Sequence, residues 1–586
     1  MCGIIVITGS RTSEVSDANM SMMLDSICSR GPDEKDFLRL GNTVLGQTRL
    51  AIVDIIDGHQ PMRDNKHPYT IVFNGEIYGY KELRDKLEKL GHSFGTKSDT
   101  EVILKAYAEY GERCVEHLDG MFAFAIWDEN KQQLFIARDR FGKKPFYYSS
   151  GGGVFFGASE IKALFEGKLT KGRIDDQSLD DYLRLGYIPP WKTIYSNVHT
   201  LPPAHAGIVK DQKLKTWRYW RLEKRRPGSQ ISYDEAKTEI KRLLVDAVRK
   251  RMVADVEIGS LLSGGVDSTL ITAYAQKCSP RPIKTFALGY GASKNELPFA
   301  LEASRKIGTE HHTCVVDVNN LEELRKVIGY FDEPHADSSD FPQQLISKHA
   351  ASKVKVALSG DGADELFMGY GWYQKYWHTP IYKRIFETPF SAYKKMTEIF
   401  REKERDELYL KKIQVDRKIE SAMVEMSSDP FDKINKCDLG IYLPGQLLVK
   451  VDRASMMHSL EVRCPFLDTA LAEFVYNLPN EFKMDKNNSK IILKDILCEI
   501  MPKEFVRRRK QGFGAPLQNW FREEGVKKEL SRITKDGHHP VYSYLKKEAV
   551  CAIFLDTDSQ NKTSIQKAWV LLCLCIWFEL HQKYHE

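Results

Sequence analysis

The stretch that decides the fold is Val256-Glu-Ile-Gly-Ser-Leu-Leu-Ser-Gly-Gly-Val-Asp-Ser268. A strand pattern over 256–262 leads into a glycine loop, and a helical pattern begins directly afterwards. A strand, a glycine loop and a helix N-terminus together present unpaired N–H groups and a positive dipole end to an anion. The stretch therefore predicts a phosphate-binding loop, and a purely structural turn is the alternative. The candidate phosphate-binding residues are Ser263, Gly264, Gly265, Asp267 and Ser268.

The residues that follow alternate between strand and helix patterns. Strands are predicted at 284–289, 311–318 and 354–358, and helices at 268–277, 295–307 and 342–352, with one more helix before the last of these. Such alternation favours an α/β domain with a parallel sheet, whose ligands bind beyond the carboxyl ends of the strands. The remainder, to residue 586, is predicted to be mostly helical.

A second loop strengthens this interpretation. Ser359-Gly-Asp-Gly-Ala-Asp-Glu365 follows the strand pattern 354–358. Carboxylates at one strand end, facing a loop that already holds Asp267, would repel one another unless a cation lay among them. Hard oxygen ligands next to polyphosphate indicate Mg²⁺. The alternative is an acidic loop that caps the following helix.

Residues 1–210 have a different texture. Short strand-like runs at 69–73, 120–127 and 153–157 are broken by Gly, Asn and Asp, and one helix is predicted from Asp99 to Leu118 behind a Ser98-x-x-Glu101 capping box. This mixture predicts an antiparallel α+β domain. The charged stretch Lys224-Arg-Arg-Pro-Gly-Ser229 precedes a long helix pattern at 233–252 and suggests a boundary, so the domains are placed at 1–210 and 231–586.

Composition narrows the class of protein. A chain of 586 residues is too long for one hydrophobic core, and 86 basic against 80 acidic residues is too even for a typical nucleic-acid binder. Eleven cysteines without CxxC pairs suit reduced thiols. There is no signal-peptide pattern, and the apolar run 568–578 is about half of the ~20 residues a membrane span needs. We predict a cytoplasmic protein with neither nucleic acid nor membrane as partner, and a buried helix at 568–578.

Cys2 is a candidate nucleophile. Removal of the initiator Met would place an α-amine of pKa about 7.7–8.0 beside its thiol, where it can act as general base. A cysteine here by chance is the alternative. Arg49 to Val53, Asn74 to Glu76 and Asp99 supply what a glutamine site needs: a guanidinium for the α-carboxylate, carboxylates for the α-ammonium, and an amide with a Gly N–H for the oxyanion.

Six motifs, in order, resemble the class II glutamine amidotransferases with an N-terminal cysteine nucleophile. They are Met1-Cys-Gly-Ile4, Arg30-Gly-Pro-Asp33, Arg49-Leu-Ala-Ile-Val-Asp54, Asn74-Gly-Glu-Ile-Tyr78, Gly120-Met-Phe-Ala-Phe124 and Arg138-Asp139. The 263–268 loop resembles the pyrophosphate loop of the ATP pyrophosphatases. With Glu461-Val-Arg-Cys-Pro-Phe-Leu-Asp468 and Lys510-Gln-Gly-Phe513, nearly the whole chain resembles the glutamine-hydrolysing asparagine synthetase family. The resemblance implies an N-terminal nucleophile (Ntn) hydrolase domain of antiparallel sheets between helices, followed by an α/β ATP-pyrophosphatase domain.

Residue roles follow from the resemblance. Cys2 would be the nucleophile, with Asn74 and Gly75 as the oxyanion hole. Glutamine would be bound by Arg49, Leu50, Ala51, Ile52, Val53, Asn74, Gly75, Glu76 and Asp99. Nucleotide contacts are implied for Leu262, Leu288, Ser359 and Gly360, Mg²⁺ and pyrophosphate for Asp267 and Asp364, the acyl-adenylate step for Asp361, and stabilisation of the transferred phosphate for Lys490.

The implied reaction uses ATP and Mg²⁺ as cofactors. Glutamine is hydrolysed at Cys2, aspartate is activated as β-aspartyl-AMP with release of pyrophosphate, and ammonia displaces AMP to give asparagine. The partners are then small molecules, with a homodimer left open. Alternatives are a β-lactam synthetase or peptide-modifying cyclase, an amidotransferase for a different carboxylate, and a non-catalytic scaffold. Three positions depart from the family pattern: Ser29 for His, Asp361 for Glu, and Met368 within Phe-Gly-Gly-Tyr.

Overall fold

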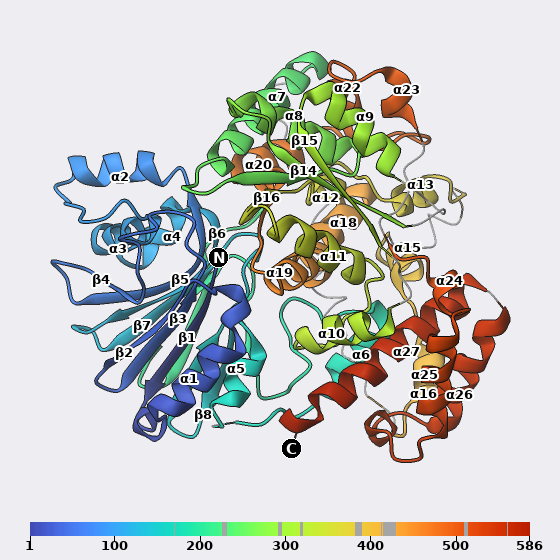
Figure 1. Ribbon diagram of the computed structural model, residues 1–586, viewed down its shortest axis with the longest axis horizontal. Coiled ribbons are helices and arrows are strands. Elements are labelled where there is room, and N and C mark those ends of the chain that lie inside the picture. The colour runs from blue at the N-terminus through green and yellow to red at the C-terminus, as the bar shows by residue number, and fades with distance from the viewer. Residues whose placement is uncertain are drawn as a thin grey trace.

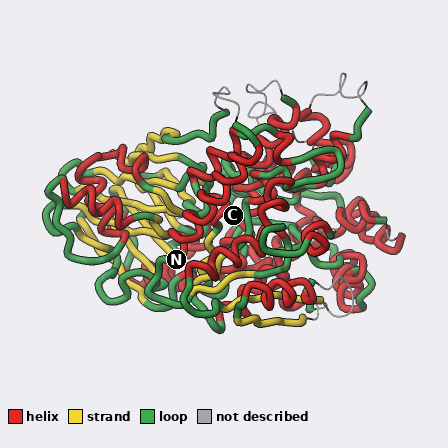
Figure 2. Tube along the Cα trace, turned by 90° about the horizontal axis from the view of Figure 1, so that it is seen from above, coloured by secondary structure: helices red, strands yellow, loops and turns green. Residues whose placement is uncertain are grey.

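The computed structural model describes residues 1–168, 170–224, 231–290, 296–316, 320–380, 382, 389–411, 413, 429–508, 514–559 and 561–585. Residues 225–229 of the predicted boundary segment and all of Lys510–Phe513 lie outside these ranges. Strands are concentrated at one end of the molecule and helices fill the other (Figure 2). The strand-rich end is the N-terminal lobe, residues 1–218.

Two six-stranded antiparallel sheets form the N-terminal lobe. The first contains, in spatial order, β10 (His199–Thr200), β8 (Tyr147–Gly151), β9 (Val154–Ala158), β1 (Cys2–Gly9), β3 (Thr43–Arg49) and β2 (Glu34–Leu40). The second contains β12 (Lys213–Arg218), β11 (His205–Lys210), β7 (Gln133–Arg138), β6 (Asp119–Asp128), β5 (Tyr69–Tyr78) and β4 (Met62–Arg63). Strand β12 belongs to this sheet although it lies beyond residue 210.

The sheets stack face to face and helices cover their outer faces. Alternate residues Ile4 and Val6 of β1 pack in one apolar cluster with Val72 of β5 and Ala123 of β6. Helices α1 (Asp17–Ser26) and α5 (Ile161–Glu166) lie on the first sheet, and α2 (Tyr80–Lys89) and α3 (Asp99–Tyr110) lie on the second (Figure 1). This confirms the predicted antiparallel sheets between helices.

One detail of the predicted helix at 99–118 is wrong. Helix α3 ends at Tyr110, because Gly111 has φ 59°, and a separate short helix α4 (Cys114–His117) follows. The capping box does not form. The Ser98 hydroxyl accepts from the Thr100 N–H at 3.1 Å, while the Glu101 carboxylate is turned to the loop before the helix.

The second lobe is built on a five-stranded parallel sheet. Its spatial order is β15 (Glu310–Val316), β14 (Lys284–Tyr290), β13 (Ile258–Leu261), β16 (Val356–Leu358) and β17 (Glu461–Arg463). The order runs outward in both directions from β13, so the winding reverses between β13 and β16. Ligands of open α/β sheets bind at such a switch point. The loops that start at Ser263 and Ser359 follow these two strands.

Helices cover both faces of this sheet, which explains why the central strands β13, β14 and β16 are mostly buried. One face packs on α7 (Tyr233–Arg251), α8 (Val266–Cys278), α20 (Thr469–Asn477) and α22 (Ile491–Leu497), and the other on α11 (Asp340–Ala351) and α19 (Leu448–Met456). The predicted α/β alternation is confirmed, with α9 (Leu297–Ile307) and α10 (Leu321–Tyr330) in the expected places. Strand β17 was not predicted.

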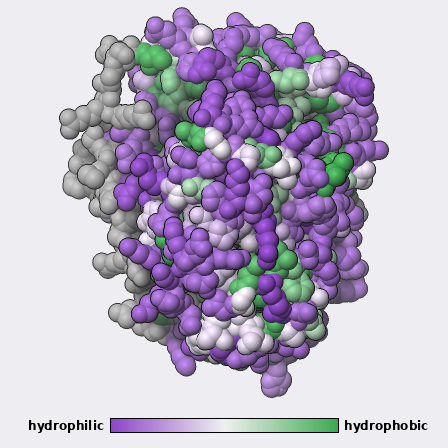
Figure 3. Space-filling model, turned by 90° about the vertical axis from the view of Figure 1, so that its left-hand side faces the viewer, coloured by the Kyte–Doolittle hydropathy of each residue, from purple (hydrophilic) through white to green (hydrophobic). Residues whose placement is uncertain are grey.

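Helix α27 (Lys562–His581) ends the chain (Figure 1). By length and composition the segment Lys562–Tyr584 could cross a membrane, but 67% of its apolar window is buried inside the molecule. Val570 and Leu574 pack with Trp520 in the core of the C-terminal lobe. The prediction of a buried helix at 568–578 is confirmed. On the opposite side of the molecule, the visible surface is mostly hydrophilic with small scattered apolar patches (Figure 3).

Candidate functional site

Cys2 begins the central strand of the first sheet. Its Cα pairs with that of Arg49 on β3, and it is 6% exposed. The Cys2 backbone N–H donates to Asn74 Oδ1 at 3.1 Å. The other amide atom, Asn74 Nδ2, is buried and has no hydrogen-bond partner among the described residues. A buried donor without an acceptor is costly, so the fold holds an unused N–H group next to the cysteine.

Gly75 follows Asn74 in β5 and has φ 152°, a conformation that L-residues rarely adopt. A Cβ placed on it would lie 2.0 Å from the Met121 carbonyl oxygen of the paired strand β6. The position therefore accepts only glycine, and the adjacent strand approaches its backbone closely.

A small cavity of about 30 Å³ collects most of the residues predicted to bind glutamine. Its lining includes Cys2, Arg49, Leu50, Ile52, Val53, Gly75, Glu76 and Asp99. Ala51 and Asn74 are buried but do not line it. The Ala51 N–H donates to Asp33 Oδ2 at 2.8 Å. Met1, only 2% exposed, also lines the cavity and fills part of it.

The charged groups of the cavity come from both lobes. Arg49 Nη1 donates to Glu34 Oε1 at 2.7 Å and Nη2 to the Asp54 carbonyl at 2.6 Å. Burial raises the pKa of Asp99 to about 6, against the hydrogen bond from the Ile77 N–H. Glu76 accepts from Arg463 Nη2 at 3.1 Å, and Arg463 belongs to β17 of the C-terminal lobe.

The second site lies where the two predicted loops touch. A Cβ on Gly360 would lie 2.8 Å from the Asp267 Cβ and 2.9 Å from the Ser268 nitrogen, so glycine is what lets the loops meet. Gly264 has φ 73°, a left-handed conformation that favours glycine at that position of the first loop. The Ser263 and Ser268 hydroxyl oxygens are 3.1 Å apart. The predicted phosphate loop and the 359–365 loop are thus brought together at the switch point.

A lysine side chain lies between two of the carboxylates that were predicted to bind Mg²⁺. Lys490 Nζ lies 2.6 Å from Asp267 Oδ2 and 2.7 Å from Asp364 Oδ1. Asp267 Oδ1 is buried without a hydrogen-bond partner within the described ranges. Nowhere in those ranges do three or more His, Cys, Asp or Glu side chains form a metal-binding group. Two carboxylates fit a magnesium ion only if phosphate or water oxygens complete its shell.

Asp361 faces a lysine that the sequence analysis did not identify. Lys450 of α19 is 8% exposed and donates to Ser339 Oγ at 2.8 Å and Asp337 Oδ2 at 3.2 Å. Burial raises the pKa of Asp361, and the Lys450 charge opposes the rise. A lysine inside the apolar run Leu447-Leu-Val-Lys-Val451 was the available signal, because buried lysines are rare unless paired.

Further neighbours of the second site are contributed by distant segments. Arg508 donates to the Gly264 carbonyl and lies 3.8 Å from the centre of the Phe299 ring. Cys464 Sγ is 3.4 Å from Ser359 Oγ. The two predicted nucleotide-contacting leucines are both buried, Leu262 at 1% and Leu288 at 6% exposure.

Strand β17 and the residue after it reach both sites. Glu461 accepts from the Met1 ammonium at 3.0 Å, Arg463 contacts Glu76, and Cys464 contacts Ser359. The two sites are therefore joined by one short segment of chain, although they belong to different lobes.

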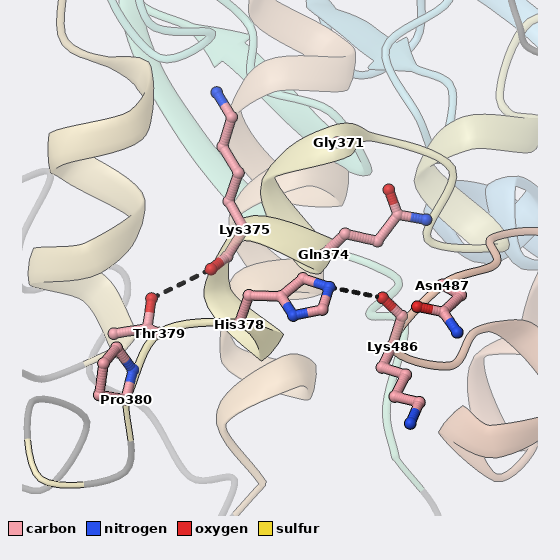
Figure 4. Close-up of a pocket in the computed structure, with 8 residues that line it drawn as sticks. All are labelled: Gly371, Gln374, Lys375, His378, Thr379, Pro380, Lys486 and Asn487. Carbon is pink, nitrogen blue, oxygen red and sulfur yellow. Dashed lines mark hydrogen bonds between the residues drawn. The ribbon is translucent and has the colours of Figure 1, made fainter.

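Two larger cavities lie elsewhere. One of about 740 Å³ is lined by Lys375, His378, Lys486 and neighbours, with His378 Nε2 2.9 Å from the Lys486 carbonyl (Figure 4). It contains none of the predicted site residues. Another, of about 540 Å³, is lined by residues that include Asp337, Trp372 and others from the C-terminal helices. Because Asp337 contacts Lys450, the second cavity adjoins the Asp361 site.

Comparison with known proteins identifies the family of the chain. The sequence model of the family described as "Asparagine synthase" matches residues 239–582, and that described as "Glutamine amidotransferase domain" matches residues 1–220. The chain belongs to the asparagine synthase family. Members of this family are ATP-dependent, glutamine-hydrolysing ligases, and the N-terminal lobe has the Ntn-like arrangement of their amidotransferase domain.

Curated members of the asparagine synthase family match over most of the chain. Asparagine synthetase [glutamine-hydrolyzing] 1 of Bacillus subtilis (strain 168) is 30% identical over 99% of this chain and 97% of its own length. Asparagine synthetase [glutamine-hydrolyzing] 3 of the same organism is 34% identical over 88% of this chain and 87% of its own length. Asparagine synthetase [glutamine-hydrolyzing] of Bos taurus is 30% identical over 89% of this chain and 86% of its own length.

Two departures from the family pattern have a structural account. Met368, which interrupts the Phe-Gly-Gly-Tyr pattern that the resemblance implies, has φ 51°, the left-handed region that glycine occupies without strain, and its side chain is fully buried. Ser29 stands where His is common, and its hydroxyl oxygen lies 2.9 Å from that of Tyr330. Neither change removes a group from the sites described above.

Proposed function

We propose that the protein makes L-asparagine from L-aspartate, with L-glutamine as nitrogen donor and ATP as activator. The observation that carries the proposal is the presence, in one chain, of the Cys2–Asn74 contact and of the Asp267–Lys490–Asp364 cluster at the sheet switch point. The family membership supports both halves of the reaction.

In the first half, Cys2 attacks the side-chain amide of glutamine. Removal of Met1 would leave the Cys2 amine where its nitrogen now donates to Asn74, and would enlarge the cavity that Met1 fills. Asn74 Nδ2, which has no other partner within the described ranges, would donate to the oxyanion of the tetrahedral intermediate. Ammonia leaves, and water resolves the thioester to glutamate.

Substrate glutamine would be held by opposite charges. Ionised Asp99 would accept from its α-ammonium beside the Glu76 carboxyl group, while the Arg49 guanidinium would bind its α-carboxylate. Because Glu76 is also bound by Arg463, the C-terminal lobe supports this part of the first site.

In the second half, the aspartate β-carboxylate attacks the α-phosphorus of ATP and pyrophosphate leaves. The N–H groups of the 263–268 loop would donate hydrogen bonds to phosphate oxygens. Lys490 would exchange its two carboxylate partners for a phosphate. Asp267 and Asp364 would then hold Mg²⁺, which neutralises phosphate charge when bound. Asp361 and Lys450 would border the acyl-adenylate.

Ammonia must cross from one site to the other without meeting bulk water, which would protonate it. Apolar side chains of both lobes meet in one buried cluster between the sites: Met1, Leu50 and Met121 from the first lobe, and Leu443, Leu447 and Leu467 from the second. A dry, apolar connection of this kind keeps ammonia neutral and nucleophilic.

The test is a complete reaction with glutamine, aspartate and MgATP. We expect asparagine, glutamate, AMP and pyrophosphate, and we expect Cys2→Ala to abolish glutamine-dependent synthesis while sparing synthesis from ammonium. Formation of ADP in place of AMP, or loss of both activities in Cys2→Ala, would contradict the proposal.

A second candidate is an amidotransferase for a larger carboxylate. The cavity of about 540 Å³ that adjoins Asp337 is much larger than an aspartate side chain requires, and aromatic residues such as Trp372, Tyr442 and Trp569 line it. Pyrophosphate release measured with a panel of carboxylic acids separates the two candidates. Release with a larger acid but not with aspartate would favour the second.

A further inference from the structure

A buried ion network lies between the lobes and touches the nucleophile's own backbone. Arg30 is fully buried, and its Nε donates to the Cys2 carbonyl at 3.2 Å. Its two terminal nitrogens bind Asp452 in a bidentate manner, at 2.8 and 3.0 Å. Asp452 also lies 3.3 Å from Lys144 Nζ. Such planar fork-to-carboxylate pairs fix geometry as well as charge.

The same network is anchored at a second point. Glu160 of the N-terminal lobe lies 3.0 Å from Arg30 and 2.8 Å from Arg453 of the C-terminal lobe. Burial disfavours ionisation of Asp452, yet Arg30 and Lys144 lower its pKa to about 2, so it remains charged. A buried charge held in this way is costly to move away from its partners.

Helix α19 carries residues that face the two different sites. Lys450 contacts Asp337 and Ser339 and faces Asp361, while Asp452 and Arg453 hold the interface network. Residues two apart on an α-helix point about 200° apart, so Lys450 and Asp452 project from opposite sides of α19. Helix α19 therefore adjoins the second site through Lys450 and is connected to the Cys2 carbonyl through Asp452 and Arg30.

We propose that Asp452 is a positioning residue that couples the two sites: through Arg30 it ties the Cys2 carbonyl to the helix that presents Lys450 to the second site. The inference rests on the proposed two-site function. A nucleotide arriving beside Asp361 adds negative charge in front of the Lys450 ammonium. Any shift of α19 toward that charge carries Asp452, and with it Arg30, relative to the nucleophile.

Coupling between the sites can be measured as the ratio of the Cys2 alkylation rate with MgATP and aspartate to the rate without them. We expect MgATP with aspartate to raise the rate at which a diazoketone analogue of glutamine alkylates Cys2 by about fivefold or more, the range typical of coupled sites. Asp452→Asn keeps the shape of the side chain but removes its charge. In that variant the acceleration should fall to less than twofold, and more than one glutamate should form for each asparagine.

The matched control is another ion pair between the lobes. Lys355 Nζ lies 2.8 Å from Asp33 Oδ2, with the two side chains 42% and 30% exposed. Exposed pairs contribute little, so Lys355→Met should keep both the acceleration and the stoichiometry of the unmodified protein. Lys144→Met is a milder second variant, because it removes one contact of Asp452 and leaves the Arg30 fork; it should lower the acceleration only partly.

Synthesis from ammonium and a thermal unfolding curve show whether Asp452→Asn is folded with a working second site. Full acceleration in Asp452→Asn, or equal loss in Lys355→Met, would overturn the proposal, as would a second site disabled in Asp452→Asn. A different result is that the unmodified protein forms no asparagine although MgATP with another carboxylic acid still accelerates alkylation of Cys2. That result would reject aspartate as the acceptor and would still support coupling between the two sites.

Discussion

Replacement of Asn74 by Ala separates stability from catalysis at the first site. The side chain is fully buried, yet it makes one hydrogen bond, from the Cys2 N–H at 3.1 Å, and its Nδ2 has no partner in the described part of the chain. Loss of one ordinary hydrogen bond costs about 0.5–1.5 kcal/mol. Loss of an oxyanion donor costs about 2.7–4 kcal/mol in the transition state, a 10²–10³-fold fall in kcat.

The assay is glutamate release against glutamine concentration, with synthesis from ammonium and thermal unfolding measured in parallel. We expect kcat for glutamate release to fall by about 10²–10³-fold in Asn74→Ala. The KM should change little, synthesis from ammonium should be kept, and Tm should fall by no more than about 6 °C.

Gln60, on the wall of the cavity beside Cys2, provides a matched amide. Its oxygen accepts from the Phe73 N–H at 2.8 Å and its nitrogen donates to Thr100 Oγ1 at 3.1 Å, so both of its polar atoms are in use. Gln60→Ala should lower Tm more than Asn74→Ala but reduce kcat far less. If kcat for Asn74→Ala stayed within fivefold of the unmodified protein, the role given to the unpartnered nitrogen would be wrong.

The remaining predictions concern charge and loop contact. Because the pKa of Asp99 is raised to about 6, its carboxylate is lost as pH falls through 6; the KM for glutamine should then rise about tenfold per pH unit, while the KM for aspartate in synthesis from ammonium does not follow. Lys490→Met leaves Asp267 and Asp364 without their ammonium, so pyrophosphate release should fall roughly 10²-fold with glutaminase unchanged; normal release would count against the cluster. Gly360→Ala must push its Cβ away from Asp267, at a cost of about 1–3 kcal/mol in a thermal unfolding curve and with a higher KM for ATP; an unchanged KM would show that the loops need not touch.

Local patterns were sufficient for most elements of the parallel sheet. Strands at 284–289 and 311–318 and helices at 268–277 and 295–307 are found within a few residues of their expected limits. Such segments have a clear period and glycine at their ends, which are properties of the local chain. Strand β17 escaped prediction because it has only three residues, Glu461–Arg463, two of them charged and buried by partners from the other lobe.

In the candidate sites, too, local motifs predicted some residues, and others are identified only by tertiary contacts. Short motifs around Cys2, Asn74 and Asp267 already indicated the chemistry. Lys450 was missed because an isolated lysine in a helix pattern is usually solvated; its apolar neighbours in the sequence indicated burial, but only packing identifies Asp337 and Ser339 as its partners. The capping box at Ser98 failed for a related reason, since tertiary contacts of the preceding loop took the Glu101 carboxylate.

By itself, the sequence determined which reactive groups the protein carries and the kind of loop that presents each of them. Residue type and spacing over a few positions specify a glycine loop, a helix start or an N-terminal cysteine. The tertiary structure alone decided which of these groups meet: Lys490 with Asp267, Arg463 with Glu76, Arg30 with Asp452. Those pairs are hundreds of residues apart, and no local pattern encodes a contact that only strand order and the packing of two lobes create.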